Sequence, residues 1–347
     1  MAKVLVTGSE GSLMQAVIPK LKAAGHEVFG VDSLERYGKR RYIAEANYPF
    51  LRGDLTDPFV VDHVFDQCQP DYVIQAAAKI YGVGGFHSHP AEILGDDVVL
   101  QTNMLKTAIE FGQLKKFIYI SSSMVYETVN THPSREGLEE QSPVPHTDYG
   151  LSKLMGERLV KAFSNQYGMD YTIWRPFNII TPFEPFEKEQ GVAHVFADFL
   201  NNIVIKGMNP LPIIGDGNQI RCFTWIDDVA QAIADFSFET VTSYQTYNIG
   251  NPEPYTMKEL AQEIYRQANE GTLLQSQKPL ELLTVKEYND DVQVRIPDVS
   301  KLQALGWEPK FKLKDSINEC LSHLATESAN ITPGQISVGG VVEPKRT

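Results

Sequence analysis

The chain has 347 residues, of which 31 are Lys or Arg and 44 are Asp or Glu, for a formal net charge of −13. This length predicts two lobes, and the acidic balance excludes a nucleic-acid binder that works by neutralising phosphates. Hydrophobic residues make up 42% of the chain, which is ample for a packed core and excludes disorder as a global description.

Strand-like and helix-like segments alternate from the N-terminus. A short buried strand starts at Lys3, Gly8 and Gly11 break its pattern, and a helix follows at residues 15–24 before a second strand that ends at Asp32. Further strands are predicted at residues 50–57, 71–78, 116–123 and 171–178, and further helices at residues 59–68, 93–111 and 149–167. This alternation predicts an α/β fold of the Rossmann type, a doubly wound parallel sheet with helices on both faces.

The second half of the chain departs from this regular alternation. A Pro- and Phe-rich segment at residues 179–186 indicates a smaller, interleaved C-terminal lobe. We expect the sheet domain to comprise residues 1–176 and about 222–250, and the smaller lobe to comprise residues 177–221 and about 251–326. Residues 327–347 are polar and contain Gly and Pro, which predicts a flexible or surface tail.

Cysteine spacing and the absence of targeting signals point to the cytoplasm. Cys68, Cys222 and Cys320 lie far apart without a CxxC pair, so neither a disulfide framework nor a metal site is predicted. The N-terminal MAKVLVTG lacks the regions of a signal peptide, and no stretch approaches the roughly 18 apolar residues of a membrane span. We therefore expect a soluble cytoplasmic protein with no membrane partner.

Residues 6–14, VTGSEGSLM, place two glycines between the first strand and the first helix. Small residues let the backbone approach a pyrophosphate, and the helix start favours its negative charge. Asp32 is placed to bind the adenosine ribose and would repel a 2′-phosphate, which favours NAD. Arg36, Arg40 and Arg41 follow closely and keep NADP open.

Met14 stands where the usual GxxGxxG turn has its third glycine, so the cofactor affinity and the helix position are left open. The turn alone fits an ordinary strand-to-helix connection equally well. Asp32 and the Gly53-Asp54 step, whose carboxylate can meet the adenine amino group, favour a cofactor site. The cofactor contacts expected from this part of the chain are Gly8, Gly11, Ser12, Leu13, Asp32, Asp54 and Leu55.

Tyr149 and Lys153 form a YxxxK pair, and their spacing places both side chains on one helix face. A Lys ammonium beside a phenol lowers the phenol pKa from about 10 toward neutrality, so that the phenol serves as general base and acid. Ser122, at the end of the strand predicted at residues 116–123, can hydrogen-bond the same substrate hydroxyl. We expect these three residues to be catalytic.

The motifs together resemble the nucleotide-sugar epimerase/dehydratase family of extended short-chain dehydrogenases/reductases, UDP-glucose 4-epimerase-like, over about residues 3–325. Besides the glycine turn, the resemblance rests on SSSMVYE (121–127), YGLSK (149–153), RPFN (175–178), GDGNQIRCFTWIDDVAQAI (215–233), YNIGNPEPYT (247–256) and VRIPDVSKLQALGWEPKFKL (294–313). These motifs are specific for the family and only weakly specific for one reaction.

The resemblance implies that the sheet domain binds NAD and that the smaller lobe binds a nucleotide-diphosphate sugar. The implied cofactor contacts are Ala76, Ala77, Lys79, Tyr149 and Lys153, and the implied substrate contacts are Ser122, Asn178, His194, Arg221 and Arg295. Two alternatives stay open, because Arg221 could form a surface salt bridge and Arg295 could pair with Asp298. A homodimer through the helices at residues 93–111 and 149–167 is also implied.

Reactions of this family begin with oxidation at the sugar C4 and diverge through further acid/base groups. Where dehydratases carry an Asp-Glu pair, decarboxylases a Glu and 3,5-epimerising relatives a Cys, this chain has Ser123 and Met124. We therefore expect a nucleotide-sugar 4-epimerase.

Several alternatives stay open beside the 4-epimerase. Through His87, His89 or His194, the chain could be a 4,6-dehydratase, a 3,5-epimerase or a 4-keto-sugar reductase; a role for His194 in shaping the pocket or binding the diphosphate is favoured over catalysis. The glycine-rich loop at residues 80–90 is expected to be mobile or close to the sugar. An NAD-binding scaffold or sensor is the non-enzymatic alternative, and the base and sugar are not predicted.

Overall fold

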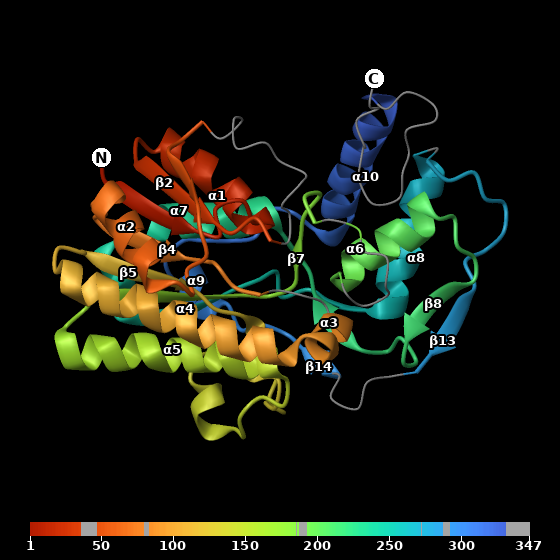
Figure 1. The fold of residues 1–347 in the computed structure, drawn as a ribbon. Helices are drawn as coiled ribbons and strands as arrows, with labels where there is room; N and C mark the ends of the chain where they lie inside the picture. The colour runs from red at the N-terminus through yellow and green to blue at the C-terminus, as the bar shows by residue number, and fades with distance from the viewer. Residues whose placement is uncertain are drawn as a thin grey trace.

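The computed structural model describes residues 1–35, 47–79, 83–184, 186, 193–271, 273–286 and 292–330. A seven-stranded parallel sheet of order β11-β6-β5-β4-β1-β2-β3 forms its centre (Figure 1). Its strands are β1 (Lys3–Thr7), β2 (Glu27–Asp32), β3 (Phe50–Arg52), β4 (Tyr72–Gln75), β5 (Lys116–Ile120), β6 (Tyr171–Pro176) and β11 (Gln245–Ile249). The predicted Rossmann-type fold is confirmed.

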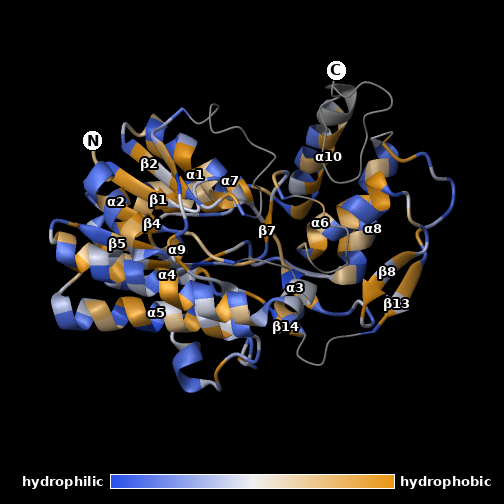
Figure 2. Cartoon of the chain, viewed as in Figure 1, coloured by the Kyte–Doolittle hydropathy of each residue, from blue (hydrophilic) through white to orange (hydrophobic). Residues whose placement is uncertain are grey.

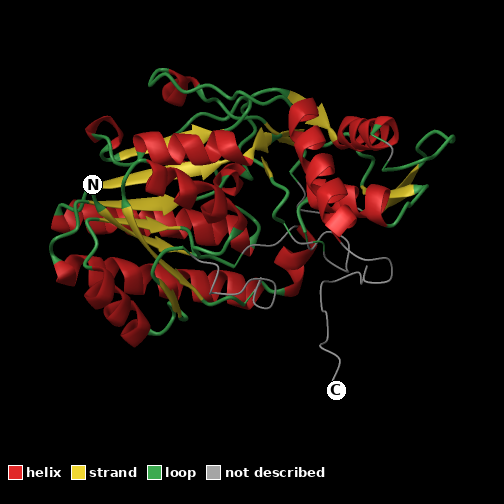
Figure 3. Cartoon of the chain, turned by 90° about the horizontal axis from the view of Figure 1, so that it is seen from above, coloured by secondary structure: helices red, strands yellow, loops and turns green. Residues whose placement is uncertain are grey.

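Helices cover both faces of this sheet, as the view from above also shows (Figure 3). The helices of the two faces are α1 (Ser12–Ala23) and α7 (Ile226–Phe236) on one, and α2 (Pro58–Cys68), α4 (Pro90–Phe111) and α5 (Asp148–Tyr167) on the other. Alternate residues of β1 enter separate hydrophobic clusters, Val4 and Val6 on the α1 side and Leu5 on the α2 side. Burial on both faces explains the continuous apolar strands visible in Figure 2.

A smaller group of elements lies beside the carboxyl ends of the central strands (Figure 1). Its short strands are β7 (Ile179–Ile180), β8 (Leu211–Ile214), β9 (Ile220–Cys222), β10 (Thr224–Trp225), β12 (Pro254–Thr256), β13 (Leu282–Val285) and β14 (Val294–Arg295). They pair as β8 with β13, β7 with β10, and β9 between β12 and β14. Its helices are α6 (Val195–Leu200), the π-helical turn η4 (Asn201–Ile205), α8 (Met257–Glu270) and α10 (Leu313–Asn330).

The remaining elements are short helices: α3 (Val83–Ser88), α9 (Ser300–Gln303), and the 3-10 turns η2 (Ser123–Tyr126), η3 (Leu138–Gln141) and η5 (Thr240–Thr242). No helix in the part of the chain that the structure describes is long and apolar enough to cross a membrane.

The structure corrects the bounds of several predicted elements. α1 begins at Ser12 rather than at residue 15, because its first helical hydrogen bond already runs from the Gln15 N–H to the Gly11 carbonyl. β3 ends at Arg52 because it pairs only with the last three residues of β2. α10 continues to Asn330, so the predicted tail begins inside a helix; residues 331–347 lie outside the described residues.

A buried ionic cluster joins the sheet to the helix α5. The Arg175 guanidinium on β6 donates to Glu157 of α5 through Nε at 2.8 Å and to Glu139 of η3 through Nη1 at 3.0 Å. The Ser121 hydroxyl donates to the same Glu157 carboxylate at 2.5 Å. The cluster therefore connects the residue before Ser122 to the helix that carries Tyr149 and Lys153.

Candidate active site

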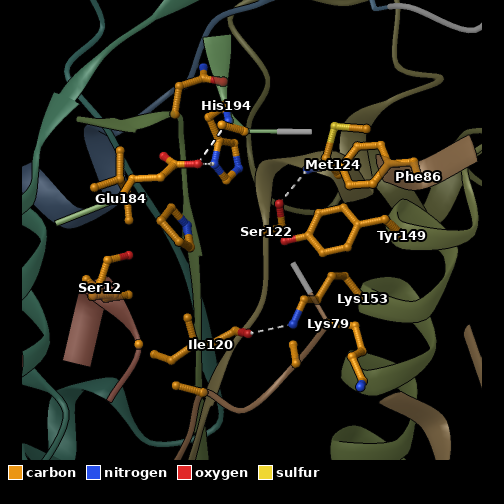
Figure 4. Close-up of a pocket in the computed structure, with 18 of the residues that line it drawn as sticks. Ser12, Lys79, Phe86, Ile120, Ser122, Met124, Tyr149, Lys153, Glu184 and His194 are labelled. Carbon is orange, nitrogen blue, oxygen red and sulfur yellow. Dashed lines mark hydrogen bonds and ion pairs between the residues drawn. The ribbon is translucent and has the colours of Figure 1, made fainter. Parts of the chain in front are cut away.

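One cavity of about 510 Å³ opens at the carboxyl ends of the central strands (Figure 4). This is the edge of a doubly wound sheet at which ligands bind. The cavity is lined by every residue predicted to act in catalysis or to contact cofactor or substrate: Gly8, Gly11, Ser12, Leu13, Asp32, Asp54, Leu55, Ala76, Ala77, Lys79, Ser122, Tyr149, Lys153, Asn178, His194, Arg221 and Arg295. The structure thus brings together residues from both halves of the chain.

The glycine turn forms one end of the cavity. Gly8 has a φ of 62°, and a Cβ on it would lie 2.9 Å from the backbone N and Cα of Ala77. Gly11 is the N-cap of α1, and no side chain among the described residues caps this helix start. The backbone N–H groups in the first turn of the helix are therefore available to a phosphate.

Met14 does not disturb this turn. Its side chain is 1% exposed and belongs to the hydrophobic cluster between α1 and the sheet, although it also touches the cavity wall. The space that a third glycine leaves open in the usual motif is filled here by a core side chain.

Asp32 lies at the end of β2, where its carboxylate is held by two backbone N–H groups. Oδ1 accepts from Leu34 at 2.8 Å and Oδ2 accepts from Glu10 at 3.0 Å. Burial raises the pKa of Asp32 above its usual value, against the effect of these two hydrogen bonds. The carboxylate keeps acceptor positions for ribose hydroxyls, while Arg36, Arg40 and Arg41 lie outside the described residues.

Lys79 follows β4 and lies on the same side of the cavity. Its ammonium forms an ion pair with Glu35 and lies 3.8 Å from Asp96, while its backbone N–H donates to Asp97. The side chain thus occupies a cluster of carboxylates rather than a purely cationic position.

The predicted catalytic residues come from β5 and from the first turns of α5. The Ser122 hydroxyl follows β5 and accepts a hydrogen bond from the Met124 N–H at 3.2 Å. Thr147 caps α5 by accepting from the Gly150 N–H, which places Tyr149 in the first turn and Lys153 one turn later. Figure 4 shows the hydroxyl of Ser122 and the side chains of Tyr149 and Lys153 along one wall of the cavity.

Lys153 is almost completely buried, at 2% exposure. Its Nζ lies 5.8 Å from the centre of the Tyr149 ring and 3.5 Å from the Ile120 carbonyl, to which it donates. Burial lowers the pKa of this ammonium, and the negative charges of Asp97 and Glu157 oppose that shift. These carboxylates help to keep the lysine cationic, which its effect on a phenolate requires.

Asp97 is a residue of the site that the sequence did not single out. Its carboxylate accepts from the Lys79 N–H at 2.9 Å and from the Ser152 hydroxyl at 3.3 Å, and burial raises its pKa. It therefore connects the end of β4 to α5 beside Lys153. The only signal available was an acidic pair, residues 96–97, within an otherwise amphipathic helix.

The segment expected as a glycine-rich loop, residues 80–90, contains the helix α3 instead, and residues 80–82 lie outside the described residues. α3 places the Phe86 ring against the Tyr149 ring. His87 and His89 are exposed and are not part of the cavity lining.

His194 is the N-cap of α6 and lines the opposite side of the cavity (Figure 4). Its Nδ1 lies 2.8 Å from Oε1 of Glu184, which also accepts from the His194 backbone N–H at 2.9 Å. Glu184 was not predicted as a site residue. The pair is the arrangement by which a carboxylate orients an imidazole.

The two arginines expected at a diphosphate lie opposite each other on neighbouring strands. Arg221 of β9 and Arg295 of β14 are partners in a parallel register. Arg295 donates through Nη2 to Oδ1 of Asn178 at 2.8 Å and contacts the Met124 sulfur. Asn178 has a φ of 28°, and such uncommon backbone geometry is concentrated at functional sites.

Metal binding has no structural support in the part of the chain described. No group of three or more His, Cys, Asp or Glu side chains there could hold a metal ion. The three cysteines are free thiols buried in the protein, and burial raises the pKa of Cys68 and of Cys222 to about 12.

Comparison with known proteins agrees with the fold and the site. Residues 4–250 match the NAD dependent epimerase/dehydratase family. GDP-L-fucose synthase 1 of Arabidopsis thaliana is 29% identical over 90% of this chain and 95% of its own length.

Two solved structures share the fold over nearly the whole chain. UDP-glucose 4-epimerase of Thermotoga maritima, solved with UDP-glucose, has a TM-score of 0.78 and 26% identity over 94% of this chain and 99% of its own. UDP-glucose 4-epimerase of Thermus thermophilus, solved with NAD, has a TM-score of 0.79 and 25% identity over 93% of this chain and 98% of its own. These relatives carry different reactions in their names, while the family match covers most of the chain. The chain therefore belongs to the NAD dependent epimerase/dehydratase family, and its cofactor is NAD.

Proposed function

We propose that this protein is a nucleotide-sugar 4-epimerase. The observation that carries the proposal is the surroundings of Tyr149: Phe86, Ile93 and Met124 form one buried cluster with it. These apolar side chains cannot remove a proton from C3 or C5 or protonate a leaving hydroxyl. Reversal at C4 needs only Tyr149 and its two partners, Ser122 and Lys153.

The residues of the turn and of the strand ends fit NAD. Gly8 permits close backbone approach, the start of α1 at Gly11, Ser12 and Leu13 would hold the pyrophosphate, and Asp32 would hold the ribose. Asp54, Leu55, Ala76, Ala77 and Lys79 would complete this contact surface. The chemistry that NAD supplies when bound is removal of a hydride from the sugar C4 and its return.

Tyr149 would act as base and then as acid. Its phenolate, stabilised by the Lys153 ammonium, takes the proton of the sugar 4-hydroxyl while the C4 hydride leaves, and the product is a 4-keto sugar. The Ser122 hydroxyl hydrogen-bonds the same oxygen. The 4-keto sugar then rotates in the cavity and presents the opposite face of C4. Hydride returns to that face, and Tyr149 gives its proton back to the C4 oxygen.

Substrate binding is assigned to the smaller group of elements, which we propose is a nucleotide-sugar lobe. Arg221 and Arg295 would neutralise the diphosphate, with Asn178 holding Arg295 in place and contacting the same group. His194, beside Glu184, would bind the diphosphate or shape the pocket. A chain with net charge −13 can bind this anion because the cations are local.

A second candidate function is 3,5-epimerisation, alone or with 4-keto reduction. The His194–Glu184 pair favours it, because an imidazole oriented by a carboxylate inside the cavity can exchange protons with carbon. Met124 weighs against it, since the thiol that such relatives carry at this position is replaced by a thioether.

The deciding experiment is a panel of UDP-, GDP- and dTDP-sugars incubated with NAD in D2O and followed by NMR. A 4-epimerase gives the C4 epimer without deuterium in the sugar and without net NADH. Deuterium at C3 or C5 of a product that has not lost water would establish the second candidate, and loss of water would establish a dehydratase. Tyr149→Phe should lower kcat at least about 100-fold and keep NAD binding. Retained activity would refute the assignment of Tyr149 as the base.

A scaffold or sensor without catalysis is the outcome if NAD binds and neither the panel nor a 4-keto nucleotide sugar supplied with NADPH reacts.

We also propose a cytoplasmic homodimer formed through α4 and α5. Val99 of α4 and Met155 of α5 are exposed hydrophobic residues on these helices. Sedimentation of Val99→Glu should show a shift to monomer, and an unchanged mass would contradict this interface.

A further inference from the structure

An apolar wall stands beside the phenol that the proposed reaction uses. The Phe86 ring stacks on the Tyr149 ring, with centroids 4.8 Å apart and planes 9° apart. Phe86 and Met124 are each 9% exposed, and both line the cavity, as Figure 4 shows. We refer to these two side chains as the Phe86–Met124 wall.

The position of the wall relates it to one part of a bound sugar. If the 4-hydroxyl lies at Tyr149 and Ser122, the two ring carbons next to C4 carry the C3 hydroxyl and the C6 group. The anomeric carbon, at the far end of the ring, carries the diphosphate that Arg221 and Arg295 would bind. In the two orientations that the proposed epimerisation requires, the C3 hydroxyl and the C6 group take turns on the side of the wall. The contact with the C3 hydroxyl is common to all sugars that differ only at C6, so the C6 group decides the difference between such sugars.

The chemistry of the wall distinguishes the forms of the C6 group. A phenyl ring has no hydrogen-bonding group, and a thioether is only a weak acceptor. A hydroxyl placed against these side chains loses its hydrogen bonds to water and forms none with the protein. A methyl group in the same place buries apolar surface, which is favourable. An apolar pocket of this kind changes kcat/KM by about ten- to a hundredfold between substrates that differ by one such group.

We propose that the Phe86–Met124 wall selects nucleotide sugars whose C6 is a methyl group or is missing, that is, 6-deoxyhexoses or pentoses. Hexoses with a C6 hydroxyl or carboxylate are disfavoured. Arg295 contacts the Met124 sulfur. A sugar with a C6 carboxylate therefore tests whether attraction to this cation outweighs the unfavourable contact with the apolar wall. The inference rests on the proposed function, because it places the 4-hydroxyl at Tyr149.

The test compares sugars that differ only at C6. UDP-glucose, UDP-6-deoxyglucose, UDP-xylose and UDP-glucuronate, with the GDP and dTDP forms of the first two, are assayed with the full-length protein and NAD. We expect kcat/KM to be at least about tenfold higher for the 6-deoxy member of each pair that reacts. Equal or higher kcat/KM for the hydroxyl or carboxylate member overturns the inference.

Binding separates this inference from the proposed function. Dissociation constants are measured by calorimetry on Tyr149→Phe saturated with NAD. If none of the sugars reacts with the native protein, the 4-epimerase proposal fails, while tighter binding of the 6-deoxy members still supports the wall. If the variant binds no nucleotide sugar, both proposals are overturned.

Matched variants test whether the Phe86–Met124 wall causes the preference for 6-deoxy sugars. Met124→Gln supplies a hydrogen-bonding partner at similar size and should reduce the 6-deoxy preference by about tenfold. Phe86→Leu keeps the surface apolar and should keep the preference while lowering kcat. Met208→Gln makes the same exchange outside the cavity lining and should change nothing in the ratio. A folded Met124→Gln protein, judged by circular dichroism, with the native preference would refute the role of the wall.

Discussion

Replacing Arg175 by Met would remove the cation between two buried carboxylates. Arg175 is 0% exposed, and the side chains of Glu139 and Glu157 are 3% and 1% exposed. Four hydrogen bonds to the carboxylates are lost, two to Glu157 at 2.8 and 2.5 Å and two to Glu139 at 3.0 and 2.6 Å. A fifth, to the Tyr126 hydroxyl, is lost as well. Met has a similar length and no charge, so the variant keeps the packing and leaves both carboxylates without their counter-ion.

The magnitude follows from this burial. Breaking a buried pair by removing one partner costs about 3–5 kcal/mol, because an uncompensated charge stays inside the protein. Since one guanidinium serves two carboxylates here, we expect the free energy of unfolding to fall by about 4 kcal/mol near pH 8.

The loss should depend on pH. Burial raises the pKa of Glu139, but its hydrogen bonds and ion pair with Arg175 prevail and hold it below the usual value. The ion pair therefore stabilises the native protein above the unfolded carboxyl pKa, and this contribution is lost as the pH falls through the depressed folded value. In the variant the Gly137 N–H and the charge of Lys161 still act on Glu139, but the contribution of Arg175 is gone. We therefore expect burial to raise the carboxyl pKa and protonation to relieve the cost. The difference between the two proteins should be smaller near pH 5 than near pH 8.

Urea denaturation of the full-length protein, followed by circular dichroism at both pH values, measures this difference. Arg266→Met is the control, because Arg266 pairs with Glu263 and Glu270 on the surface of α8 and is 45% exposed. The control should lose less than about 1 kcal/mol. A loss for Arg175→Met no larger than this, or one that is the same at both pH values, would refute the reasoning.

Three further variants test the cofactor end of the cavity. Gly8→Ala should weaken NAD binding at least about tenfold in calorimetry, because its positive φ and the Ala77 backbone leave no room for a Cβ; native affinity would contradict the close approach. Met14→Gly should lower the free energy of unfolding by about 3 kcal/mol, since the side chain is a core residue, and an unchanged urea midpoint would show that the core does not depend on it. Asp32→Asn should weaken NAD binding about tenfold and narrow the preference for NAD over NADP; an unchanged ratio of the two dissociation constants would exclude Asp32 as the selective group.

The part of the site that the sequence predicted comes from strand ends. Asp32 is the last residue of a strand, and Ser122 and Asn178 each follow one. The carboxyl ends of parallel strands meet at one edge of the sheet. Local patterns therefore suffice to place such residues in one cavity, although the strands lie far apart in the chain. A second local pattern, the four-residue spacing of Tyr149 and Lys153, placed both side chains on one face of a helix.

The rest of the site depends on packing between elements that no local pattern specifies. Asp97 reaches Ser152 only because α4 lies against α5, and Phe86 reaches Tyr149 only because α3 replaces the expected loop. Glu184 and His194 meet although they lie ten residues apart and share no periodic spacing. Element bounds were wrong for a related reason, as β3 shows: its length is set by its partner β2 rather than by its own residues.

The strand β11 completes the central sheet beside β6, although residues 177–244, which build much of the smaller group of elements and the helix α7, lie between them in the chain. During synthesis on the ribosome, β6 is therefore made long before its outer neighbour exists. At 5–20 residues per second this interval lasts on the order of ten seconds. For that time the nascent sheet carries an open, hydrogen-bonding edge of the kind that invites pairing with other chains. We expect chaperone dependence and aggregation during expression to concentrate in this window, and truncations that end before residue 245 to be insoluble even though they retain the glycine turn and the YxxxK pair.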